Sequence, residues 1–147
     1  MDLIEVLTAL SPLVLTMVAT YIVIKQYSLD KKRFKLEHFD KRYDLFKRTM
    51  EYLSLLVSNA KTDTNELMTF KRNTSDVKIF FDDDINEFID EIYSKAIRLR
   101  YCNRMIDSES LEHKKHVLIV EEESEILTWL GEQFSICEEM FIKYLKV

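Results

Sequence analysis

The chain has an uninterrupted apolar run near its N-terminus. Residues 6–24 read VLTALSPLVLTMVATYIVI and contain no charged side chain. At 1.5 Å per residue, a helix of this length spans roughly 28 Å, close to the thickness of the hydrocarbon layer of a bilayer. Acidic residues precede the run and basic residues follow it, the reverse of the order in a cleavable signal peptide. The pattern therefore predicts a retained transmembrane helix.

A second apolar pattern follows at once, with helical spacing and no helix breaker before it. Its apolar positions are separated by steps of three and four residues, as in a helix that packs against its neighbours. They are Leu36, Phe39, Tyr43, Phe46, Met50, Leu53 and Val57. We therefore expect one continuous helix to about Asn59. It would join a transmembrane anchor, residues 1–27, to a cytoplasmic helical bundle, residues 28–147.

The remaining pattern predicts three further helices. A polar loop over residues 58–65 should lead to a helix over 64–80, followed by a helix that ends near Ile106. Asp84 and Glu87 have the spacing of a capping box at the start of that helix. The last helix should cover residues 111–145, with Gly131 explained by a close helix contact. Buried thiols are expected at Cys102 and Cys137, as in a reducing compartment.

Composition supports an all-α fold. The chain has one glycine and one proline, Pro12. Tight β-hairpins and glycine-rich phosphate loops need glycine for positive φ. The composition therefore excludes a P-loop, a Rossmann fingerprint and a β-sandwich.

Charge gives the expected orientation in the membrane. The net charge is −5, yet residues 25–48 alone carry nine Lys or Arg against four Asp or Glu. The positive-inside rule then places the N-terminus outside and the C-terminal domain in the cytoplasm. The basic block can contact anionic lipid headgroups. The acidic total argues against direct binding of nucleic acid, whose affinity depends on neutralised phosphates.

Small and hydroxylated residues recur along the apolar run. Thr8, Pro12, Thr16 and Thr20 are four residues apart, and Ser11 lies beside them. This spacing keeps them near one face of a helix. The recurrence can be chance in a single anchor, or it can mark a helix-packing face or a pore lining in a homo-oligomer.

Candidate chemistry is sparse. Arg33 and His38 match the Arg-x4-His signature of HEPN ribonucleases, in which the arginine would hold a phosphate and the histidine would act as a base. Their position beside the membrane would crowd an RNA. His113 and His116 lack a third metal ligand nearby in sequence, and the acids from Asp82 to Asp84 suit a helix start. We therefore expect no catalytic residue, cofactor or metal site.

Four segments carry a family resemblance. They are residues 39–43 (FDKRY), 79–82 (IFFD), 89–93 (IDEIY) and 141–145 (FIKYL). With the single N-terminal span, they resemble a widespread family of small bacterial membrane-anchored helical proteins. The layout is also similar to that of the accessory membrane proteins of type VI-B CRISPR systems. That resemblance implies a divergent HEPN-like bundle and a ring-like membrane pore beside an RNA-guided ribonuclease.

These observations lead to one leading hypothesis and two alternatives. The leading hypothesis is a membrane-anchored homo-oligomer that perturbs the membrane in anti-phage defence, together with a cytosolic defence protein. One alternative is a membrane-tethered HEPN-like ribonuclease. The other is a non-enzymatic scaffold that recruits a cytosolic partner to the membrane.

Overall fold

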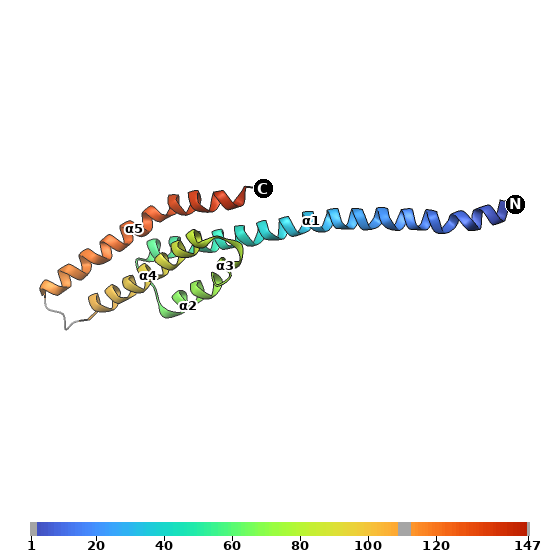
Figure 1. Ribbon diagram of the computed structural model, residues 1–147. Helices are drawn as coiled ribbons and strands as arrows, with labels where there is room; N and C mark the ends of the chain where they lie inside the picture. The colour runs from blue at the N-terminus through green and yellow to red at the C-terminus, as the bar shows by residue number, and fades with distance from the viewer. Residues whose placement is uncertain (1–2, 109–112, 147) are drawn as a thin grey trace. The chain divides into compact units, whose positions relative to one another are not determined.

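Every regular element in the described part of the chain is a helix. The computed structural model describes residues 3–108 and 113–146, with side chains from residue 10 onward. Its helices are α1 (Leu3–Asn59), α2 (Thr64–Asn73), α3 (Val77–Phe80), α4 (Asp83–Ile106) and α5 (His113–Leu145) (Figure 1). The all-α prediction and the end of the first helix at Asn59 are confirmed. The expected start of the last helix at residue 111 lies outside the described residues.

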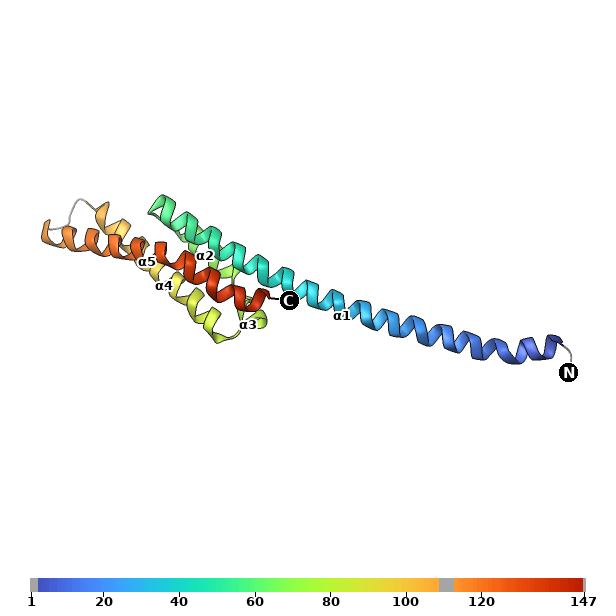
Figure 2. The same ribbon diagram turned by 90° about the horizontal axis from the view of Figure 1, so that it is seen from above.

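The chain divides into two compact units, Met1–His38 and Phe39–Val147. The second unit is a helical bundle, in which α4 runs antiparallel to α5 (Figures 1 and 2). The short helices α2 and α3 pack against α4. Its fully buried side chains are Thr49, Leu53, Leu56, Ile85, Ile89, Ile92, Leu99, Cys102, Leu130, Cys137 and Phe141. Both cysteines are buried and free, as expected.

The part of α1 in the bundle buries the predicted apolar face at most positions, and the buried face is wider than one row. Leu53 is fully buried and Phe46 and Met50 pack on the core, whereas Tyr43 and Val57 are exposed. Leu45, Thr49 and Leu56 are buried beside them. The reason is that α1 packs against two elements at once. The Tyr52 ring stacks on Phe70 of α2 with 4.0 Å between centroids, and Phe46 contacts Phe141 of α5 at 5.5 Å. Buried Thr49 satisfies its hydroxyl by donating to the Leu45 carbonyl at 2.8 Å.

The prediction of a single helix over residues 64–80 was wrong, because the helix is interrupted between α2 and α3. The Thr74 hydroxyl donates to the Phe70 carbonyl at 2.9 Å, and the Ser75 hydroxyl donates to the Arg72 carbonyl at 2.8 Å. Side chains of this kind compete for backbone groups and favour turns. Leu67 and Phe70 of α2 and Val77 of α3 are nevertheless buried in the core.

The expected capping box at Asp84 and Glu87 was also wrong. The N-cap of α4 is Asp82, which makes no capping hydrogen bond through its side chain. Instead, Asp82 and Asp84 accept hydrogen bonds from the Tyr144 hydroxyl of α5, at 3.0 and 2.8 Å. A reciprocal capping box is found at Asp63 and Glu66, at the start of α2.

Arg42 fixes the same corner of the bundle from α1. Its guanidinium donates to the Phe80 carbonyl at 2.9 Å and to the Tyr144 carbonyl at 3.1 Å. It also lies over the rings of Phe81 and Tyr144, with 5.9 and 5.8 Å to their centroids. One half-buried arginine thus joins α1 to the end of α3 and to the end of α5.

Gly131 does not make the close helix contact expected of it. A Cβ atom added there would meet no atom within 4 Å, and the position is exposed.

Because glycine is about 1 kcal/mol less favourable than alanine inside a helix, Gly131→Ala should stabilise the protein by about that amount. The matched control, Ser135→Ala at another exposed position of α5, should stabilise the protein less. Thermal unfolding of purified full-length protein in detergent tests this. A lower melting temperature for Gly131→Ala would show that the glycine contacts another molecule.

Cys137 makes the bundle sensitive to alkaline pH. Burial raises the pKa of its thiol from 9.0 to about 12. Above pH 9 the unfolded chain releases a proton that the folded chain keeps, so the free energy of unfolding should fall by up to about 1.4 kcal/mol per pH unit. Cys137→Ala should lower stability at pH 8 but reduce the further decline up to pH 11. The measurement is the melting temperature of both proteins from pH 8 to pH 11. An equal fall in the two proteins would contradict a raised pKa of the Cys137 thiol.

Candidate functional site

The apolar segment of α1 is uncovered by the described part of the chain. Side chains from Leu10 to Ile24 are exposed, including Leu15 at 68% and Ile24 at 63%. By length and composition, α1 is the one helix in the described residues that could cross a membrane. A run of large apolar side chains without cover needs another apolar phase or another protein surface.

The hydroxyl stripe on this segment is partly satisfied within the helix. Thr16 donates to the Pro12 carbonyl at 2.7 Å, and Thr20 donates to the Thr16 carbonyl at 2.8 Å. Each hydroxyl can then enter an apolar phase without losing a donor bond, and its oxygen can still accept one. Ser11 is exposed beside them. The side chain of Thr8 lies outside the described residues.

Two tyrosine–lysine pairs follow the apolar segment on α1. The Lys25 ammonium lies 5.8 Å from the centroid of the Tyr21 ring, and that of Lys31 lies 5.6 Å from the Tyr27 ring. Such pairs combine an apolar ring with a cation, the combination favoured where hydrocarbon meets lipid headgroups. They lie on the same side of the apolar segment as the basic block of residues 25–48.

Arg33 and His38 both lie on α1 within the first unit. Arg33 is exposed, His38 is half buried, and the His38 ring contacts Phe34 with 4.3 Å between centroids. Both residues follow closely on the apolar segment, nine and fourteen positions after Ile24.

Among residues 3–108 and 113–146, no group of three or more His, Cys, Asp or Glu side chains has metal-binding geometry. His113 and His116 lie in the first turn of α5, where His113 is exposed and His116 is half buried.

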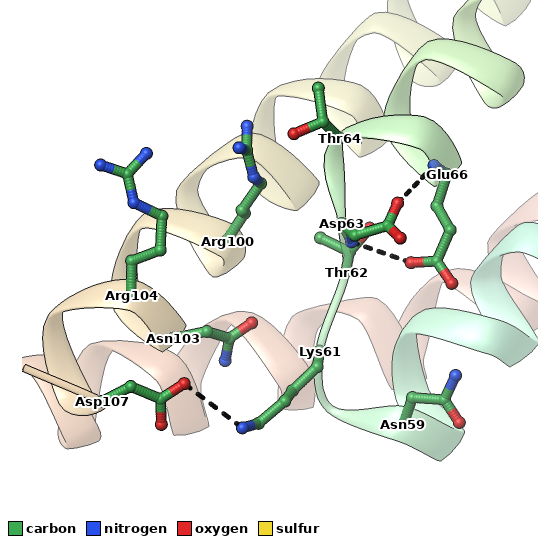
Figure 3. A pocket seen from close by; sticks show the side chains of 10 residues that line it. All are labelled: Asn59, Lys61, Thr62, Asp63, Thr64, Glu66, Arg100, Asn103, Arg104 and Asp107. Carbon is green, nitrogen blue, oxygen red and sulfur yellow. Dashed lines mark hydrogen bonds and ion pairs between the residues drawn. The ribbon is translucent and has the colours of Figure 1, made fainter.

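The bundle contains a polar pocket that the sequence did not predict. It has a volume of about 450 Å³ and lies between the end of α1, the connection to α2 and the C-terminal part of α4 (Figure 3). Its lining includes Lys61, Thr62, Asp63, Glu66, Arg100, Asn103, Arg104 and Asp107. Nearly every lining side chain is polar or charged, so the pocket suits a polar ligand.

A strained turn and Asn103 shape the floor of this pocket. Ala60, directly after α1, has φ of 51°, a left-handed conformation that favours glycine. The Asn103 side-chain amide donates to the Ala60 carbonyl at 3.1 Å and to the Glu123 carboxylate at 2.6 Å. These bonds hold the turn against α4 and α5. They also identify which end of the Asn103 amide is nitrogen, since both partners are acceptors.

Two residues that line the pocket, Thr62 and Asn103, carry buried polar atoms without partners, as does the nearby Tyr52. The side-chain oxygens of Tyr52, Thr62 and Asn103 have no hydrogen-bond partner among the described residues. Burial raises the pKa of the Tyr52 hydroxyl to about 12, and the neighbouring Thr62 hydroxyl offsets part of this rise without reaching hydrogen-bond geometry. An unsatisfied buried acceptor is costly, and each such group in a folded protein calls for an explanation.

The charges of the pocket are divided between its two sides. Asp63 and Glu66 are held by their capping box, with hydrogen bonds of 2.8 and 2.9 Å to each other's backbone N–H. Lys61 is 3.5 Å from Asp107. Arg100 and Arg104 have no ion-pair partner among the described residues, and Figure 3 shows their guanidinium groups pointing the same way from α4. The α4 side therefore carries two uncompensated cations.

Sequence reasoning missed this site for a physical reason. Arg100, Asn103 and Arg104 share a helix face, but their counterpart is the connection after α1, about forty residues earlier in the chain. The only local signal was the spacing of two arginines four residues apart on a helix. Residues 58–65 were expected to be a plain polar loop.

Comparison with known proteins gives no relatives for this chain. No protein-family model, curated protein or solved structure matches it. Its function must therefore be argued from its own residues.

Proposed function

We propose that the chain is a single-pass membrane protein that self-associates and perturbs the membrane, as a pore or accessory effector in bacterial anti-phage defence. The observation that carries the proposal is the apolar segment from Leu10 to Ile24, whose side chains are all exposed on α1. Lipid and the anchors of other copies are the surroundings that can cover it.

The flanking chemistry supports a membrane boundary after the apolar segment. The Tyr21–Lys25 and Tyr27–Lys31 pairs suit the headgroup layer, and the basic residues beyond them favour the cytoplasmic side. The bundle from Phe39 onward would then be cytoplasmic.

A membrane pore requires self-association of this chain. A single helix cannot surround a channel, so several copies are needed. Thr16 and Thr20 lie on a face whose hydroxyl oxygens can still accept hydrogen bonds, which suits a lumen or a helix contact better than lipid.

Replacing Thr16 and Thr20 together by leucine tests this proposal. The span stays apolar, so membrane insertion and oligomer size in detergent should be unchanged. A lumen lined by this face would become narrower and drier, because hydrophobic constrictions close pores by dewetting. We expect cells that produce the parent protein to depolarise and cells that produce the double variant not to, as measured with a voltage-sensitive dye.

The matched control is Val14→Leu with Val18→Leu, which adds bulk on the opposite face of α1 and should leave depolarisation intact. A Thr16–Thr20 variant that assembles and depolarises cells like the parent would exclude a lumen on this face. A monomer in detergent would exclude the pore itself and favour the scaffold alternative.

His38→Ala separates the proposal from the ribonuclease alternative. Because His38 lies on the basic part of α1 close to the proposed membrane boundary, where a bilayer would crowd an RNA, the variant should keep its membrane level and its depolarising activity. Loss of RNA cleavage in cells, with assembly and depolarisation unchanged, would instead support the HEPN-like ribonuclease.

A further inference from the structure

We propose that the polar pocket between α1, α2 and α4 binds a small organic phosphate ester that carries hydroxyl or amino donors, the class of nucleoside monophosphates and sugar phosphates. The site lies wholly within the second unit and does not depend on the function of the anchor. Three observations carry the inference: the arginine pair, the orphaned oxygen of Asn103 and the size of the pocket.

The arginine pair supplies the anion-binding side. Arg100 and Arg104 are one helical turn apart on α4, and both line the pocket (Figure 3). Guanidinium groups bind phosphate through paired N–H donors in a planar fork, and two adjacent cations match a dianion better than a carboxylate. Lys61 is already engaged by Asp107, so the two arginines are the cations left for a ligand.

Asn103 supplies the position that needs a donor. Asn103 is only 7% exposed, and Figure 3 shows its side chain extending from α4 toward the segment at Lys61 and Thr62. Its nitrogen is satisfied by Ala60 and Glu123, so its oxygen is left to accept. A ligand O–H or N–H group at this point would satisfy an acceptor that has no partner in the described chain.

The opposite wall adds further acceptors. Asp63 and Glu66 each use one carboxylate oxygen in the capping box, which leaves the other oxygen of each free to accept from a ligand. The pocket is therefore cationic on α4 and rich in acceptors toward α2. A phosphate ester with hydroxyl or amino groups matches both sides.

The volume excludes a bare phosphate as the fitting ligand. About 450 Å³ is within the range of small-molecule sites and would hold on the order of fifteen waters at roughly 30 Å³ each. Inorganic phosphate would fill only a small part of it and would leave the acceptor side empty. A pentose phosphate or a nucleoside monophosphate has the required length.

Titration calorimetry of the full-length protein in detergent tests the inference. The probes are ribose 5-phosphate and the four ribonucleoside 5′-monophosphates, with inorganic phosphate and adenosine as truncated ligands. We expect at least one ester to bind at least tenfold more tightly than either truncated ligand. Arg100→Gln with Arg104→Gln should weaken that binding at least tenfold without lowering the melting temperature, because neither side chain has an ion-pair partner among the described residues.

The matched control is Lys114→Gln with Lys115→Gln, which removes the same charge from an exposed part of α5 and should leave binding unchanged. Equal weakening by the control would overturn the site, since only overall charge would then matter. Inorganic phosphate binding as tightly as every ester would overturn the role of Asn103. No binding by any ester would mean that the pocket holds only water, and would overturn the proposal as a whole.

Discussion

No described residue covers the apolar side chains between Leu10 and Ile24. They therefore need an apolar environment outside the chain, and the position of the whole protein depends on that need. In water, a helix with so many exposed apolar groups would associate or aggregate. Within a bilayer the same helix satisfies its backbone internally and its side chains through lipid. The threonines fit this setting because they donate to carbonyls of their own helix. The chemistry of this segment therefore determines where the remainder of the protein can act.

The bundle depends on different forces. A continuous apolar core is closed at one corner by Arg42 and Tyr144, which tie the ends of α3 and α5 to the start of α4. At the opposite end of α4, Asn103 holds the turn at Ala60. These two polar clusters connect residues that are forty to one hundred positions apart, so they fix the register of helices that apolar packing alone would leave free to slide.

The sequence predicted helices well and tertiary detail poorly. Apolar periodicity found α4 and α5, because a helix face is a local property. On α1 it found the buried positions Phe46 and Leu53 but also included Tyr43 and Val57, which are exposed, because contacts with α2 and α5 decide which part of the apolar face is covered. It assigned Asp82 and Asp84 to helix capping, whereas both accept from Tyr144, some sixty residues away. The pocket was not predicted for the same reason, because Arg100 and Asn103 form it only together with the segment after α1, which is distant in sequence.

Reporters fused to the C-terminus of the full chain in bacteria test whether the apolar segment crosses a membrane, with one reporter active only in the cytoplasm and the other active only outside it. We expect the protein to stay in the membrane fraction, the cytoplasmic reporter to work and the external one to be silent. A working external reporter, or a chain recovered in the soluble fraction, would contradict this expectation.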